Sequence, residues 1–255
     1  MILHTIEAGE GPPVTLLHGL FGSARNLGVV QRTLAARYRV LALDMRNHGA
    51  SPHAPAMDYP AMAEDVLETL DQRSALPAVL IGHSMGGKAA MMAALQRPEL
   101  VTRLVAADIA PVPYQHDNAR IADALLGLKL TPGLTRAAAD PVLADAVPDA
   151  GMRAFLLQNL VPGRHPAWRI GLHEIAAAMP AIEGWKTPSG AMYRSPALFV
   201  AGAASDYVRA EHRPAIRTLF SAARFLTLKH AGHWLHVDNP DGFISVLEAF
   251  LGAPT

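Results

Sequence analysis

Cysteine is absent from this 255-residue chain. Disulfides, thiolate metal sites and cysteine nucleophiles are therefore excluded. An excess of charge of either sign is also missing, because 22 Lys and Arg balance 22 Asp and Glu. Proteins that bind nucleic acids or anionic membranes normally carry a basic stripe, so neither kind of partner is expected.

Long apolar runs are missing as well. No uninterrupted apolar stretch approaches the roughly 18 residues that a membrane span needs, so no such span is expected. Residues 1–7 lack a basic segment followed by a long apolar one, so we expect no secretory signal and a cytoplasmic location. Apolar residues are nonetheless abundant, at 51% of the chain against 17% charged. This balance is typical of an ordered globular protein with a large core.

Short apolar runs alternate along the chain with segments of helical periodicity. The predicted strands are residues 14–17, 40–43, 78–81, 104–107, 197–201 and 225–228. The predicted helices are residues 27–37, 62–72, 86–97, 210–220 and 243–251. This alternation predicts an α/β fold with a mostly parallel sheet flanked by crossover helices. Residues 2–7 are predicted to add an antiparallel or edge strand.

Residues 112–194 break the alternation. No convincing strand appears there, and Ala- and Leu-rich pieces separated by Pro and Gly predict short helices instead. These pieces are residues 121–126, 141–147, 152–160 and 170–179. We interpret the segment as a helical lid inserted between sheet strands, with residues 1–111 and 195–255 forming the core. Such a lid would cover the carboxyl ends of the strands, where parallel sheets bind ligands.

The pattern Gly82-x-Ser84-x-Gly86 follows an apolar run and opens a helix. A serine in a sharp strand-to-helix turn projects its hydroxyl outward, and neighbouring glycines remove the Cβ clashes of such a turn. The context therefore favours Ser84 as a nucleophile over an ordinary helix-capping serine.

A nucleophilic serine needs a base, and His233 is the best placed of the 12 histidines. It follows the last predicted strand, and it comes after the nucleophile and any candidate acid, as in serine sites of this kind. Imidazole, with an ordinary pKa of about 6.5, accepts and returns a proton near neutrality. His230, His233 and His236 recur every three residues, but without paired carboxylates or an i,i+4 spacing we expect no metal site.

Two aspartates satisfy the chain order for the acid that orients this base. Asp108 ends an apolar run, where an unpaired carboxylate would be costly and a histidine partner would offset the cost. Alternatively it ties down the start of the lid. Asp206 lies in a loop of small residues, where it is solvated, caps the next helix or serves as the acid. From the residues alone both assignments stay open.

Backbone amides are expected to hold the negative oxygen of a tetrahedral intermediate. The turn geometry assigns one amide to Met85, and the Gly-rich loop at residues 18–23 offers a second from Leu20 or Phe21. Phe21 and Trp234 are candidates for lining the substrate pocket, although each is also an ordinary core residue. Lys88 follows Ser84 by four residues, so it does not fit the S-x-x-K spacing, and we expect it to be solvated or ion-paired.

Taken in order, these motifs resemble those of the α/β-hydrolase superfamily over nearly the whole chain. More narrowly, the chain is similar to the YbfF-type bacterial esterases and their mitochondrial relatives. The longer strings that carry this resemblance are His18-Gly19-Leu20-Phe21-Gly22-Ser23, Arg46-Asn47-His48-Gly49, Gly82-His83-Ser84-Met85-Gly86-Gly87-Lys88, Asp108-Ile109-Ala110-Pro111-Val112 and Gly232-His233-Trp234. The lid matches much less well.

The resemblance also bears on the acid. In the superfamily the acid commonly lies about three residues past the glycine that ends the strand at 197–201, and here that position is Ser205. In the YbfF-like subgroup a serine is expected there, and the aspartate that matches Asp108 is the implied acid. We therefore favour Asp108 over Asp206, with Ser205 as an auxiliary hydrogen-bonding group.

The resemblance implies a serine esterase that acts on small acyl esters or thioesters and needs neither metal nor cofactor. Its expected partner is the small-molecule substrate, and no motif specifies an oligomeric state. Two alternatives stay open. One is another cofactor-free chemistry with the same triad, such as carbon–carbon bond hydrolysis or perhydrolysis. The other is a ligand-binding protein without turnover on the same fold.

Overall fold

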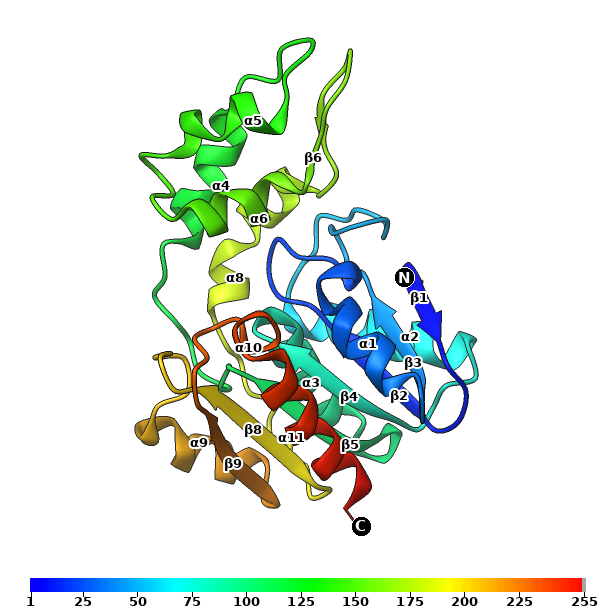
Figure 1. Ribbon diagram of the computed structural model, residues 1–255. Coiled ribbons are helices and arrows are strands. Elements are labelled where there is room, and N and C mark those ends of the chain that lie inside the picture. The colour runs from blue at the N-terminus through cyan, green and yellow to red at the C-terminus, as the bar shows by residue number, and fades with distance from the viewer. Residues whose placement is uncertain (254–255) are drawn as a thin grey trace.

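The computed structural model describes residues 1–253 and contains a seven-stranded sheet (Figure 1). The strand order is β1-β3-β2-β4-β5-β8-β9. The bounds are β1 (Thr5–Ala8), β2 (Pro13–Leu17), β3 (Arg39–Leu43), β4 (Ala78–His83), β5 (Val101–Ala107), β8 (Ala197–Gly202) and β9 (Ala223–Leu228). All neighbouring strands are parallel except β1, which pairs with β3 in the antiparallel sense at the edge. The predicted parallel sheet with an antiparallel edge strand is confirmed.

Helices cover both faces of this sheet because its strands are apolar on both sides. The helices α1 (Gly28–Leu34) and α11 (Pro240–Gly252) cover one face, while α2 (Tyr59–Gln72), α3 (Met85–Gln96) and α9 (Arg213–Leu219) cover the other (Figure 1). Successive residues of β3 belong to opposite cores: Val40 packs under α1 and α11, and Leu41 packs under α2 and α3. None of the helices in residues 1–253 is long and apolar enough to cross a membrane.

The segment between β5 and β8, here called the insertion (residues 112–194), rises from the sheet as a separate group of short helices (Figure 1). Its elements are α4 (Asn118–Gly127), α5 (Arg136–Ala139), α6 (Ala150–Leu157), α7 (Leu172–Ala177) and α8 (Met179–Glu183). The prediction of a helix over 141–147 is wrong except for a 3₁₀ turn at Pro141–Leu143.

The expectation that the insertion contains no strand is also wrong. Two strands, β6 (Leu160–Val161) and β7 (Ala167–Trp168), form a small antiparallel ladder, and the helix predicted over 152–160 ends before it at Leu157. Each strand has only two residues, so the alternation of apolar and polar residues that identifies a strand has no length over which to appear.

The joint between β4 and α3 is a sharp turn at Ser84, whose backbone has φ 52° and ψ −120°. A Cβ atom on Gly82 would lie 2.2 Å from the carbonyl oxygen of Gly86, and one on Gly86 would lie 2.5 Å from the carbonyl oxygen of Leu17. Both contacts are with backbone atoms, which shift less readily than the end of a flexible side chain. The two glycines are therefore required because backbone segments approach each other closely at these positions. The positive φ angle of the turn belongs to Ser84 and not to either glycine.

This packing predicts that replacing two helical glycines by alanine has opposite effects on stability. Gly86→Ala should lower the free energy of unfolding by about 2–3 kcal/mol, because the new methyl group meets fixed backbone. Gly127→Ala, at the end of α4, meets nothing within 4 Å and should raise that free energy by about 0.4–1 kcal/mol. Urea unfolding of both variants measures the two values. Equal effects of the two substitutions would contradict a close backbone contact at Gly86.

Candidate active site

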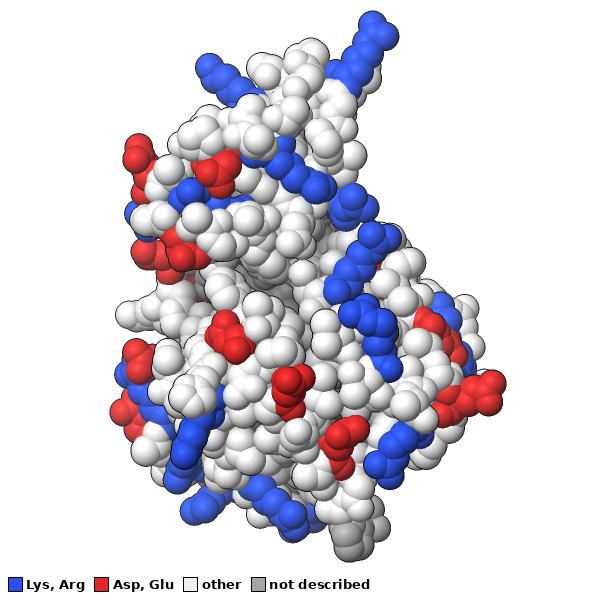
Figure 2. Space-filling model, viewed as in Figure 1, with Lys and Arg blue, Asp and Glu red and all other residues white. Residues whose placement is uncertain are grey.

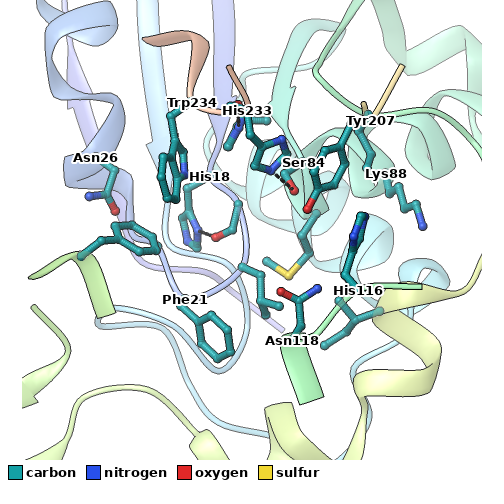
Figure 3. A pocket seen from close by; sticks show the side chains of 18 of the residues that line it. His18, Phe21, Asn26, Ser84, Lys88, His116, Asn118, Tyr207, His233 and Trp234 are labelled. Carbon is teal, nitrogen blue, oxygen red and sulfur yellow. Dashed lines mark hydrogen bonds between the residues drawn. The ribbon is translucent and has the colours of Figure 1, made fainter. Parts of the chain in front are cut away.

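Three side chains from distant parts of the chain form a connected row at the carboxyl edge of the sheet. The Ser84 Oγ atom lies 3.1 Å from Nε2 of His233 (Figure 3). Nδ1 of His233 lies 2.8 Å from Oδ2 of Asp108. Ser84 occupies the turn between β4 and α3, Asp108 directly follows β5, and His233 lies on the loop after β9. The distances are those of hydrogen bonds that link a hydroxyl, an imidazole and a carboxylate.

The carboxylate of Asp108 is fully buried and makes three hydrogen bonds. Its Oδ1 atom accepts from the amide of Gly202 at 2.9 Å, and its Oδ2 atom accepts from the Ser205 hydroxyl and from the His233 ring. Asp206 is exposed, and its backbone carbonyl accepts from Nε of Arg209, whereas its carboxylate has no hydrogen-bond partner among residues 1–253. Of the two aspartates considered from the sequence, Asp108 therefore lies beside the histidine and Asp206 does not.

A second histidine, which the sequence reasoning missed, supports the first. The Nε2 atom of His83 donates to the backbone carbonyl of His233 at 2.7 Å, because a carbonyl only accepts. Burial lowers the pKa of His83 well below its ordinary value, and the neighbouring His233 and His236 act in the same direction. The ring of Tyr207 stacks on His233 with centroids 3.8 Å apart. His83 precedes Ser84 in the chain, so the motif shows that the two residues are neighbours. It does not show that the His83 ring contacts the carbonyl of His233.

The loop after β2 offers backbone amides beside Ser84, and the structure distinguishes the two candidates. The amide of Phe21 donates to Nε2 of His48 at 3.0 Å. The amide of Leu20 donates to no acceptor within residues 1–253. Met85 is the first residue of α3, so its amide has no partner inside the helix. Leu20 and Met85 are therefore the amides that remain available to a substrate oxygen, and Phe21 is not.

The direction of the Leu20 amide is set by its neighbour. The carbonyl of Gly19 accepts from Nδ1 of His18 at 2.8 Å and from the amide of Gly22 at 3.0 Å. Nε2 of His18 accepts from the amide of Met45, so Nδ1 carries the proton. In a planar trans peptide the carbonyl and the following N–H point in opposite directions. Holding the Gly19 oxygen thus turns the Leu20 N–H away from it.

A pocket opens in front of Ser84 and lies between the core and the insertion. Figure 2 shows the molecule hollowed between these two parts, with mainly uncharged residues lining the hollow. Phe21 and Trp234 both line the pocket (Figure 3), and Trp234 lies 5.9 Å from Phe155 of the insertion between ring centroids. Polar side chains line another part of it, among them His116 and Asn118.

Lys88 departs from the expectation of a solvated or ion-paired side chain. It is 1% exposed, and its Nζ atom donates to the carbonyls of Glu183 and Gly184 at 3.2 and 2.7 Å. No carboxylate lies within 4.0 Å of it in the described part of the chain. Sequence spacing does not reveal this contact, because the carbonyls belong to the insertion nearly 100 residues away.

The buried histidines predict how stability depends on pH. Burial lowers the pKa of four of them: His18, His48 to about 3, His83, and His236 to about 4. Below an ordinary pKa of about 6.5 the unfolded chain takes up protons that the folded chain does not, so folding stability decreases as the pH decreases from 6.5 toward 3. Each histidine contributes up to about 1.4 kcal/mol per pH unit in this range. Urea unfolding at a series of pH values measures the slope.

A pair of variants identifies the source of this slope. His48→Gln keeps an acceptor for the Phe21 amide but does not titrate. It should therefore reduce the slope of unfolding free energy against pH by up to the contribution of one histidine, about 1.4 kcal/mol per pH unit. His165→Gln changes an exposed histidine and serves as the control, with an unchanged slope. An unchanged slope in His48→Gln would contradict the assignment of the lowered pKa.

Comparison with known proteins agrees with this geometry. The model of the alpha/beta hydrolase fold family matches residues 12–240. The chain is 42% identical over 250 residues to mouse sn-1-specific diacylglycerol lipase ABHD11, a match covering 94% of this chain and 81% of that one. It is 39% identical over 243 residues to Escherichia coli esterase YbfF, covering 94% and 92%. A solved marine microorganism esterase superposes with a TM-score of 0.94 at 34% identity, covering 98% and 99%. The chain belongs to the α/β-hydrolase fold family and, within it, to the YbfF-like esterases.

Proposed function

We propose that the protein hydrolyses small acyl esters or thioesters through an acyl-enzyme on Ser84. The observation that carries this proposal is the unbroken row of hydrogen bonds from the Ser84 hydroxyl through His233 to Asp108. Such a row activates a hydroxyl that is otherwise a weak nucleophile. The esterase and lipase names of the relatives favour an ester over the carbon–carbon bond or peracid alternatives.

In the proposed reaction, Nε2 of His233 takes the proton of Ser84 as Oγ attacks the carbonyl carbon. Asp108 holds the proton on Nδ1, which orients the ring and stabilises the imidazolium. The amides of Leu20 and Met85 donate to the oxygen that becomes negative. His233 then returns the proton to the leaving alcohol or thiol as the ester bond breaks. Water, activated by the same ring, releases the acyl group, and every step uses only side chains, amides and water.

The insertion has a place in this proposal as the lid over the site, with residues 1–111 and 195–255 as the core. Phe155 of the insertion, together with Phe21 and Trp234 of the core, supplies an apolar wall for an acyl chain. Burial of a methylene against such a wall contributes about 0.8 kcal/mol. Ser205 supports the acid, because its hydroxyl donates to the same Asp108 oxygen that accepts from His233.

Turnover of a substrate panel tests the proposed activity. The panel contains p-nitrophenyl acetate, butyrate and octanoate, an acyl thioester, and a 1,2-diacylglycerol because one relative is named a diacylglycerol lipase. We expect turnover by the wild type and a decrease in kcat of about 10⁴–10⁶-fold in Ser84→Ala. A fluorophosphonate should label the peptide that contains Ser84. Binding without turnover, and without labelling, would instead identify a ligand-binding protein on this fold.

The assignment of the acid has its own test. Asp108→Asn should lower kcat/KM by about 10³–10⁴-fold, because the amide no longer holds the His233 ring in the required tautomer and charge. Asp206→Asn changes an exposed residue that is not part of the row, so it should leave kcat/KM within about twofold. A larger loss in Asp206→Asn than in Asp108→Asn would overturn the assignment.

A further inference from the structure

Lys88 is a buried cation that the proposed reaction does not use. It lies on α3 one helical turn beyond Ser84, and its side chain is 1% exposed. Its ammonium group donates to the carbonyls of Glu183 and Gly184, where α8 ends and the chain returns from the insertion to β8. A charge buried at this depth is costly unless it is hydrogen-bonded, and both of its hydrogen bonds are with one short segment.

That segment, here called the exit hinge (residues 182–184), is held at each of its carbonyls. The Tyr59 hydroxyl donates to the carbonyl of Ile182, and the amide of Tyr114 donates to that of Glu183 at 2.9 Å. The last carbonyls of a helix have no partners within the helix, so these outside donors satisfy them. Tyr59 belongs to α2, and Lys88 belongs to α3, which directly follows Ser84 and is here called the nucleophile helix. The hinge is thus fixed to two helices of the core.

Aromatic rings complete the surroundings of the ammonium group. Nζ of Lys88 lies 5.3 Å from the ring centroid of Tyr59 and 4.8 Å from that of Tyr114, both within the range of a cation–π contact. The carboxylate of Glu183 accepts from Nδ2 of Asn118 at 3.1 Å and forms no ion pair with the lysine within residues 1–253. The partners of this cation are therefore the hinge carbonyls and two rings that pack against the hinge.

We propose that Lys88 is a positioning residue that ties the exit hinge to the nucleophile helix and so sets the distance between Ser84 and the insertion wall of the pocket. Ile182 and Glu183 line that pocket, so a displacement of the hinge moves part of the wall directly. The hydrogen bonds from Lys88 to the carbonyls of Glu183 and Gly184 are here called the tie. Substrates that reach the wall depend on the tie, and substrates too small to reach the wall do not. The effect on substrates rests on the proposed esterase function, whereas the tie itself does not.

The tie depends on pH. Burial lowers the pKa of Lys88 to about 7, against a smaller opposing effect of Glu183. The titratable groups around it are Glu183, His116, Tyr59 and Tyr114. Below pH 7 the ammonium donates charge-assisted bonds, which are about twice as strong as neutral ones. Above pH 7 the neutral amine weakens both these bonds and the cation–π contacts, so the hinge loosens as the pH increases.

The decisive kinetic comparison uses the ratio of kcat/KM for p-nitrophenyl octanoate to that for p-nitrophenyl acetate. Both substrates use the same catalytic row, so its titration cancels in the ratio. Lys88→Met should lower the ratio about tenfold, mainly through KM for the octanoate, which is the loss expected for one charged hydrogen bond. Lys88→Arg should restore part of it. Lys186→Met, the same change at an exposed position beside the hinge, should leave it unchanged. An unchanged ratio in Lys88→Met would overturn the proposal.

If Lys88→Met does not fold, the pH dependence of the same kcat/KM ratio in the wild type and in Lys88→Arg tests the proposal. In the wild type the ratio should decrease as the pH increases through about 7, whereas in Lys88→Arg it should stay constant because the guanidinium does not titrate in this range. A ratio in the wild type that is independent of pH would contradict the tie.

Amide hydrogen exchange separates this proposal from the proposed function, because it needs no turnover. Peptides that cover the exit hinge should exchange at least tenfold faster in Lys88→Met than in Lys186→Met, while peptides of the central strand β4 should not change. Equal exchange of the hinge peptides would overturn the tie even if esters are hydrolysed. Faster exchange in a protein that hydrolyses no ester would support the tie and reject the esterase.

Discussion

The carboxylate of Asp108 has no exposed surface, and the rest of the site is arranged around the need to satisfy it. Its three hydrogen bonds come from the end of β8, from the loop after β8 and from the loop after β9. A buried carboxylate without such partners would cost several kcal/mol. The same bonds that satisfy the charge fix the ring of His233, and the ring in turn lies at hydrogen-bond distance from Ser84. The hydrogen bonds that satisfy the buried carboxylate in the folded protein therefore also hold the three side chains in place.

Three neutral histidines hold backbone groups around the site through hydrogen bonds. His18 holds the carbonyl of Gly19, His48 accepts from the amide of Phe21, and His83 donates to the carbonyl of His233. Burial keeps the pKa of each low, so each ring stays uncharged. The rings of His18 and His48 each donate one hydrogen bond and accept another. The amide of Leu20 is left available only because its neighbours are engaged. The proposed oxyanion site thus depends on rings that must stay neutral, which makes the fold sensitive to acid.

The sheet and its flanking helices were predictable from the sequence because they depend on local periodicity. The motifs likewise singled out Ser84 and His233, which the structure places at hydrogen-bond distance. The choice between Asp108 and Asp206 needed the resemblance to a subgroup, since both follow a strand in the required order. Which backbone amide stays without an acceptor, that of Leu20 or that of Phe21, depends on the orientation of one peptide. The identity of the side chains does not reveal that orientation. The burial of Lys88 and the small ladder of β6 and β7 were missed because each depends on contacts within or across the insertion, where local patterns are weak.

We propose that Asp108 acts through His233 and not independently. A double-mutant cycle of Asp108→Asn and His233→Gln, measured as kcat/KM with p-nitrophenyl acetate, tests it most directly. In groups that act as a unit the losses are strongly non-additive. If Asp108 acts only through His233, Asp108→Asn should change kcat/KM by less than about threefold once His233 is replaced. Losses that multiply, with Asp108→Asn costing about as much in the His233→Gln background as in the wild type, would contradict it.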